Sequence, residues 1–129
     1  MTVIAWDGKT LAADKRATCS GVHSTTTKMI RIQVRMQQGI HIPEWLAWTG
    51  EQDSGEIVAR WYADGADPAN WPKCQEDKEA WSRLIVADRN GCKFFERQPI
   101  GVRVEDPFSA WGSGRDFALA AMHLGKTAR

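Results

Sequence analysis

The second residue of the chain has the functional groups of a nucleophile. Thr2 follows Met1, and a small second residue permits removal of the initiator methionine. Thr2 would then carry a hydroxyl and a free α-amine, whose pKa near ~7.7–8.0 leaves much of it a neutral base at physiological pH. A hydroxyl is a weak nucleophile until a base removes its proton, and the residue's own amine can do this. Many proteins begin with Met-Thr, so this feature needs support from its neighbours.

Asp14 is a candidate partner of Thr2. Residues 2–14 flank an Asp-Gly-Lys turn signal at 7–9, which predicts a β-hairpin. With a three-residue loop, Thr2 lies directly opposite Asp14 on one face, with Cβ atoms roughly 4.5–5.5 Å apart. A loop of two or four residues would put the two side chains on opposite faces. The alternative interpretation is that Asp14 only ends the strand and caps the following turn.

Lys28 opens the next clear strand, because residues 28–35 alternate with period two. A buried Asp14 would be costly alone, and a neighbouring cation would offset that cost. Lys28 beside Asp14 and Thr2 would form a charge pair and favour the threonine alkoxide. The alternative is an ordinary solvated lysine at a strand end.

The remaining elements must hold these side chains in place. The sequence predicts a strand at 40–48, with Pro43 marking an edge or bulge, and a helix capped by Asp53 or Ser54 that runs through Tyr62. Further predicted elements are strands at 81–87, 92–97 and 100–104, and a last helix after the Trp-Gly-Ser-Gly segment at 111–114. The order of strands, helix, strands and helix favours α+β layers.

Composition limits the function classes. The chain has 129 residues, of which 43% are hydrophobic, enough for one domain with one core. A net charge of +1 with mixed signs argues against a nucleic-acid partner, and no apolar run approaches the length of a membrane span. Three cysteines without CxxC spacing predict reduced thiols in the cytoplasm. His23, His41 and His123 lack ligand spacing, so we expect no metal and no cofactor. The seven tryptophans are expected in the core, or in an interface.

Five segments together resemble the proteasome β subunits and the bacterial two-component protease HslV. Residues 2–8 and Leu-Ala-Ala-Asp-Lys-Arg-Ala-Thr at 11–18 are similar to the family's N-terminal threonine, hairpin and A-A-D-x-R-A-T stretch. Lys28-Met29-Ile30 is similar to its lysine before an apolar strand, and Trp48-Thr49-Gly50 with Asp53 to the glycine turn that opens its first helix. The 111–114 segment with its alanine-rich helix is similar to the family's G-S-G and following helix. The resemblance runs from Thr2 to about Leu124.

The resemblance implies a role for each matching residue. Thr2 would be the nucleophile with its amine as general base, Lys28 would lower the pKa of the hydroxyl, and Asp14 would orient Lys28. The backbone N–H of Gly50 would form the oxyanion hole, and Ser113 would hydrogen-bond near the Thr2 amine. Trp48 falls where the family lines a substrate pocket, and its indole would leave that pocket shallow. A place in the ordinary core is the alternative for Trp48.

The chain also departs from the family pattern. Its first hairpin is shorter than usual, and family members continue past the alanine-rich helix with a second helix, further strands and a late aspartate. We therefore expect a single domain over residues 1–129, truncated after that helix. Its fold is expected to be the α+β Ntn-hydrolase sandwich, αββα, with antiparallel sheets between helices and an incomplete C-terminal part.

The resemblance implies a threonine-type peptidase that cleaves peptide bonds through an acyl-enzyme on Thr2 after loss of Met1. It also implies a homo-oligomeric ring and an ATP-dependent unfoldase as partner. Two other functions stay open: a catalytically inactive assembly subunit of the same fold, and an N-terminal nucleophile amidohydrolase that acts on a small amide.

Overall fold

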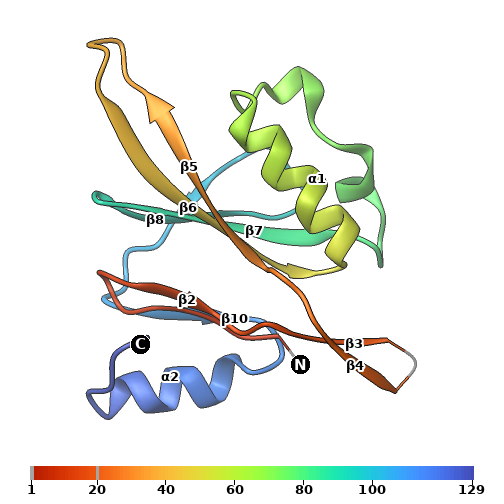
Figure 1. The fold of residues 1–129 in the computed structure, drawn as a ribbon, viewed down its shortest axis with the longest axis vertical. Coiled ribbons are helices and arrows are strands. Elements are labelled where there is room, and N and C mark those ends of the chain that lie inside the picture. The colour runs from red at the N-terminus through yellow and green to blue at the C-terminus, as the bar shows by residue number, and fades with distance from the viewer. Residues whose placement is uncertain (1, 20) are drawn as a thin grey trace.

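Two antiparallel sheets stack between two helices in the computed structural model, which describes residues 2–19 and 21–129 but not the side chains of residues 18 and 19 (Figure 1). The strands are β1 (Ile4–Trp6), β2 (Leu11–Ala13), β3 (Arg16–Cys19), β4 (Val22–Thr25), β5 (Met29–Arg35), β6 (His41–Gly50), β7 (Ser82–Asp88), β8 (Gly91–Phe95), β9 (Val102–Arg103) and β10 (Ser109–Trp111). The helices are α1 (Gln52–Ala63) and α2 (Arg115–His123), with short 3₁₀ turns η1 (Pro68–Asn70) and η2 (Lys73–Glu76).

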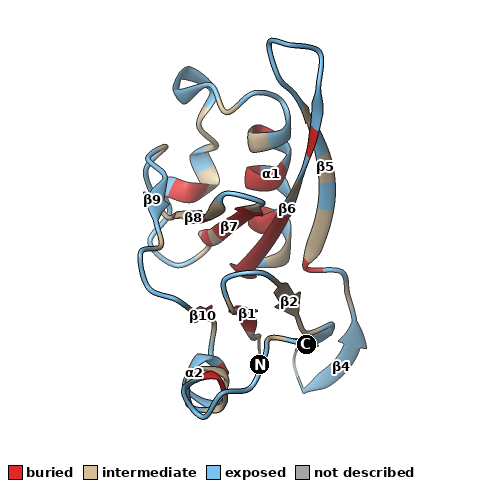
Figure 2. Ribbon diagram, turned by 90° about the vertical axis from the view of Figure 1, so that its left-hand side faces the viewer, coloured by how far each residue is buried: buried red, intermediate tan, exposed pale blue. Residues whose placement is uncertain are grey.

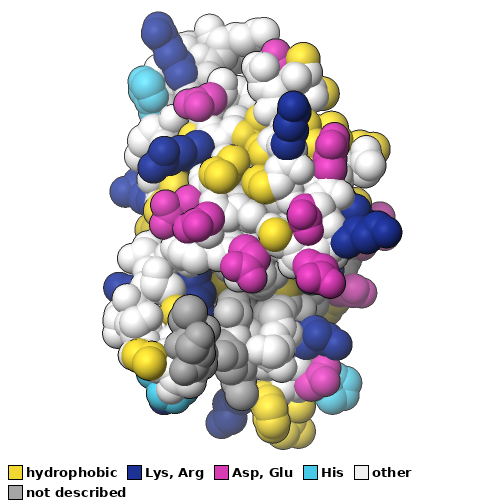
Figure 3. All heavy atoms as spheres, turned by 90° about the vertical axis from the view of Figure 1, so that its right-hand side faces the viewer, with side chains coloured by type: hydrophobic (Ala, Val, Ile, Leu, Met, Phe, Trp, Pro, Cys, Tyr) yellow, Lys and Arg dark blue, Asp and Glu magenta, His cyan; other side chains and the backbone are white. Residues whose placement is uncertain are grey.

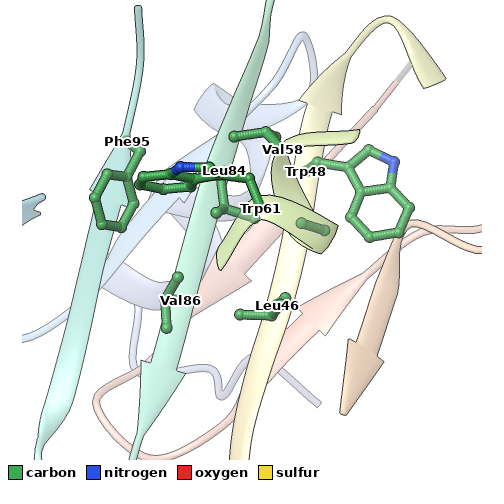
Figure 4. Packing of buried hydrophobic residues seen from close by; sticks show 8 residues of the cluster. Leu46, Trp48, Val58, Trp61, Leu84, Val86 and Phe95 are labelled. Atoms are coloured by element: carbon green, nitrogen blue, oxygen red, sulfur yellow. The ribbon is translucent and has the colours of Figure 1, made fainter. Parts of the chain in front are cut away.

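The larger sheet carries α1 on one face. Its strands run in the order β5–β6–β7–β8–β9, each antiparallel to its neighbour. Side chains alternate between the faces of a strand, and on β6 this turns Leu46 and Trp48 toward α1. They pack there with Val58 and Trp61 of the helix and with Leu84 of β7, as Figure 4 shows.

The opposite face of the larger sheet packs on the smaller sheet, whose strand order is β10–β1–β2. Ile4 and Trp111 of the smaller sheet meet Ala47 and Ile85 of the larger one in a second buried cluster. Helix α2 packs on β1 and β10 at the outer side of the smaller sheet (Figures 1 and 2). The layers therefore run helix, sheet, sheet, helix, as the family resemblance implied.

The first hairpin differs by one residue from its predicted register. Trp6 pairs with Leu11, so the loop holds four residues rather than three. The Asp7 carboxylate accepts hydrogen bonds from the amides of Lys9 and Thr10 at 2.9 and 2.7 Å, which stabilises the longer loop. The prediction that Thr2 lies directly opposite Asp14 is therefore wrong.

Helix α1 begins earlier than predicted, and neither Asp53 nor Ser54 caps it. Glu51 holds the N-cap position, and its side chain makes no capping hydrogen bond. The hydroxyl of Ser54 instead donates to the carbonyl of Ala80. Three further strands are absent from the sequence prediction: β3 and β4, which form a two-stranded hairpin, and the three-residue β10.

The tryptophans divide between core and surface. Trp6, Trp48, Trp61 and Trp111 are buried, whereas Trp45 is exposed beneath the guanidinium of Arg31 at 5.7 Å. The indoles of Trp61 and Trp71 meet edge to face at 4.6 Å. Most of the tryptophans therefore pack in the core.

The surface carries interspersed charges, and Figure 3 shows acidic and basic side chains mixed over one face. Cys74 and Cys92 carry free thiols. The expectations for the side chain of Cys19 and for removal of Met1 concern parts outside the described residues. No helix among the described residues is long and apolar enough to cross a membrane.

Candidate functional site

Lys28 lies at the centre of the candidate site. Its ammonium donates to Thr2 Oγ1 at 3.2 Å and to both carboxylate oxygens of Asp14 at 3.0 Å. A further hydrogen bond runs from the same ammonium to the carbonyl oxygen of Arg16. Lys28 is only 5% exposed, so these acceptors replace the water that the charge would otherwise hold.

Asp14 reaches the site because it lies just beyond the end of β2, where strict strand alternation ends. Its backbone amide donates to the carbonyl of Val3 at 3.1 Å, and its carboxylate accepts from the amides of Val3 and Arg16 at 2.9 and 3.1 Å. The carboxylate thereby turns toward Lys28. Asp14 and Thr2 are joined through Lys28, without the directly opposed pairing that the sequence predicted.

The charge state of Asp14 follows from these contacts. Burial raises the pKa of its carboxyl group, but the hydrogen bonds from Val3, Lys28 and Arg16 and the charge of Lys28 outweigh that effect. The net result is a pKa below the ordinary value for aspartate. Asp14 is therefore an anion at neutral pH and a fixed counter-charge to Lys28.

Ser113 lies on the other side of Thr2. The Thr2 nitrogen donates to Ser113 Oγ at 3.1 Å, and the Thr2 carbonyl accepts from the amide of Gly114 at 3.0 Å. Pairing of β10 with β1 brings these distant segments together, because Ile4 lies opposite Trp111. The structure thus gathers Asp14, Lys28 and Ser113 around Thr2.

Gly50 is the last residue of β6, and its N–H faces the edge of that strand next to Lys28. The amide of Trp48 donates to the carbonyl of Lys28 at 3.1 Å. Amides two residues apart on a strand face the same edge, so the N–H of Gly50 also faces the edge of β6 next to Lys28. Strand β5 begins only at Met29, and Gly50 therefore lies beyond the end of that neighbour.

Trp48 belongs to the core between α1 and the larger sheet, with 3% of its surface exposed. A Cβ added at Gly55 of α1 would lie 2.1 Å from its Cδ1 atom, so only glycine allows this close approach. The Trp48 indole donates to Gln52 Oε1 at 3.1 Å, and Gln52 Nε2 donates to the carbonyl of Thr27 at 3.1 Å. Trp48 thus helps to hold the residue before Lys28, and its place beside a substrate pocket stays a prediction.

An open groove lined by polar and charged residues lies next to the site, along the β3–β4 hairpin. It has a volume of about 360 Å³ and is lined by Lys15, Arg16, His23, Ser24 and Thr25. Within the described residues, no group of three histidine, cysteine or acidic side chains could hold a metal ion. The chemistry available here is that of a hydroxyl, an ammonium, a carboxylate and backbone amides.

The carbonyl of Arg16 is a part of the site that the sequence does not predict. The carbonyl of Arg16 accepts a hydrogen bond from Lys28, but every residue has a carbonyl, so the sequence holds no signal for this contact. The partial clue was the position of Arg16 two residues after Asp14, within the turn that Asp14 was expected to cap.

The fold has counterparts among solved structures. No model of a protein family matches the sequence, and no curated protein is significantly similar to it. The structure of Thiobacillus denitrificans BPH in complex with epoxomicin is similar over 97% of this chain and 79% of that chain, with a TM-score of 0.64 and 19% identity. Eukaryotic HslV from Trypanosoma brucei is similar over 95% of this chain and 77% of that chain, with a TM-score of 0.58 and 19% identity. This likeness shows the fold alone: an α+β sandwich of antiparallel sheets between helices, as in HslV.

Proposed function

We propose that this protein is a threonine-type peptidase of the proteasome and HslV class, with Thr2 as its nucleophile after removal of Met1. The observation that carries the proposal is the contact of 3.2 Å between Lys28 Nζ and Thr2 Oγ1, with Asp14 behind the ammonium and Ser113 beside the Thr2 nitrogen. A hydroxyl that faces a buried ammonium can lose its proton more easily than a solvated one.

The proposed reaction uses two steps. The Thr2 amine takes the proton of Oγ1 while the oxygen attacks the scissile carbonyl, and that proton then passes to the leaving amine as the peptide bond breaks. Water, activated by the same amine, hydrolyses the resulting ester and frees Thr2. While Met1 is attached, the Thr2 nitrogen is part of a peptide bond and cannot act as this base.

Gly50 is the proposed donor to the oxyanion. Its N–H faces the Lys28 edge of β6, where charge would develop on the scissile carbonyl oxygen. The open groove along β3 and β4 would accept an extended peptide. Trp48 would border the deep side of the substrate pocket and limit its depth.

Assembly belongs to the same proposal. We expect a homo-oligomeric ring that encloses the threonines, an ATP-dependent unfoldase that delivers peptide chains, and a cytoplasmic location. The comparison with HslV from Trypanosoma brucei supports this through the fold alone. Analytical ultracentrifugation of the purified protein measures the oligomer, and a monomer at micromolar concentration would contradict the ring.

Intact-mass spectrometry and a substrate panel test the proposed activity. We expect the purified protein to have lost Met1 and to cleave fluorogenic peptides, with Thr2→Ala inactive. Cleavage of small amides but not of peptides would favour an amidohydrolase. Stable rings that retain Met1 and cleave neither would favour an inactive assembly subunit.

A further inference from the structure

The turn that carries Gly50 is held by a buried polar pair, Gln75 and Ser82. Both residues are fully buried, with 0% of their surface exposed. The proposed reaction uses neither residue. Buried polar side chains are retained only where they are hydrogen-bonded, so their partners indicate what they do.

Gln75 forms hydrogen bonds with the backbone of Ser82 in β7, at a level that β8 does not reach. Its Nε2 donates to the carbonyls of Ser82 and Glu96 at 2.6 and 2.8 Å, and its Oε1 accepts from the amide of Ser82 at 2.9 Å. The side-chain amide thereby acts as a short piece of backbone next to β7. Ser82 is fixed on both of its backbone polar groups.

Ser82 in turn contacts the glycine turn directly. It is the ladder partner of Gly50, and its hydroxyl donates to the carbonyl of Glu51. That same carbonyl accepts the amide of Gly55 at 2.9 Å, the first hydrogen bond of α1. Ser82 therefore ties the strand end to the helix start at the residue after Gly50.

Gly50 fits this position because of its conformation and its neighbours. Its φ is +98°, which L side chains rarely adopt. A Cβ added there would lie 2.7 Å from the carbonyl oxygen of Trp81 and 3.1 Å from Ser82 Cα. The backbone at Gly50 therefore lies too close to β7 to accommodate a side chain.

We infer that Ser82, fixed by Gln75, is a positioning residue that sets the direction of the Gly50 N–H. The inference rests on the proposed function, in which the Gly50 N–H of this turn donates to the oxyanion. A donor that stabilises developing charge must be preorganised, and a small misplacement by a remote mutation can cost up to about 100-fold in rate.

Ser82→Ala tests the inference, with Ser54→Ala as its matched control. Both serines are buried and donate to a backbone carbonyl, but Ser54 bonds Ala80 and not the glycine turn. In protein that has lost Met1, we expect Ser82→Ala to lower kcat about 10- to 100-fold with KM within about twofold, as for an interaction made in the transition state. Ser54→Ala should keep kcat within about twofold of the wild type. An unchanged kcat in Ser82→Ala, or an equal loss in both variants, would overturn the inference.

A second measurement does not depend on activity. We expect the NMR order parameter of the Gly50 amide to be near about 0.85 in the wild type and in Ser54→Ala, and to fall toward about 0.6 in Ser82→Ala. Equal order parameters in all three proteins would overturn the inference even if kcat changed. A wild type without turnover would count against the proposed function, and the order parameter would still decide whether Ser82 holds the turn.

Discussion

Lys28 Nζ lies 3.2 Å from Thr2 Oγ1, inside a pocket of acceptors that leaves the lysine 5% exposed. The two residues are 26 positions apart, and they meet because the amide of Trp48 holds Lys28 against β6 while Ser113 and Gly114 hold Thr2. A buried ammonium with a hydroxyl as one of its few partners is costly to retain for stability alone. The proposed function gives this charge a role, because it would act on the hydroxyl of Thr2.

Lys28→Met should remove activity and weaken the fold. Loss of the ammonium leaves the hydroxyl without its charge partner, and we expect kcat/KM to fall at least about 100-fold, as on removal of an electrostatic stabiliser. We expect the free energy of unfolding to fall by about 2 kcal/mol. This is less than the loss on breaking a fully buried ion pair, because the side chain of Asp14 is 24% exposed. Chemical denaturation and peptide assays measure both effects. Lys126→Met, at an exposed position after α2, is the control, and an equal loss there would contradict the assignment.

The pH dependence of stability should report on Asp14. Its pKa is lowered in the folded protein, whereas an unfolded aspartate titrates near about 3.9. The carboxylate therefore stabilises the fold fully above about pH 4, and this contribution is lost as the pH falls through the lower, folded-state pKa. We expect the difference in unfolding free energy between wild type and Asp14→Asn to be constant near neutral pH and to shrink below about pH 4. A difference that grows on acidification would contradict the lowered pKa.

Ser113→Ala should impair activity without harming the fold. Ser113 is exposed and its hydroxyl accepts from the Thr2 nitrogen at 3.1 Å. After loss of Met1 that nitrogen is the proposed base. We expect kcat/KM to fall by less than the roughly 100-fold that marks the lower end for loss of a general base, because the amine itself remains. The pH–rate profile should shift, because the contact to the amine is lost. An unchanged pH–rate profile together with unchanged thermal stability would contradict a role of Ser113 in the site.

The resemblance to the proteasome and HslV family predicted the order of layers, and it named side chains that meet at the candidate site, but the local geometry could not be predicted. Period-two alternation identified β5, and helical spacing identified α1. The hairpin register was missed because the Asp7 carboxylate, and not loop composition, selects a four-residue loop. Asp14 reached Lys28 through its backbone contacts with Val3, so the predicted neighbourhood was right for a different reason.

Long-range contacts explain the other differences. Strand β10 has three residues and forms only because β1 lies beside it, so no local pattern marks it. Among the described residues, β3 and β4 pair with each other alone, and β4 is exposed along its whole length, so it lacks the hydrophobic alternation that identifies a strand. The helix cap was misplaced because Ser54 bonds Ala80, which lies 26 residues away.

Gly55→Ala should destabilise the core strongly. The added methyl group would lie 2.1 Å from the indole of Trp48, and overpacking of a well-packed core costs about 1–3 kcal/mol or more. The displaced indole would also disturb Gln52 and with it the segment before Lys28. We expect a lower denaturant midpoint and reduced peptidase activity. Arg60→Ala, at an exposed position of the same helix, should stay within about 0.5 kcal/mol of the wild type.

The central claim, that Thr2 is a working nucleophile, is tested most directly by covalent labelling. The purified protein would be incubated with epoxomicin, an N-terminal-threonine-reactive epoxyketone, and its mass and labelled peptide determined. We predict one label per chain on Thr2 of protein that has lost Met1, no label on Thr2→Ala, and slow labelling of Lys28→Met. Retention of Met1 in every native preparation, or equal labelling of Thr2→Ala, would contradict the claim.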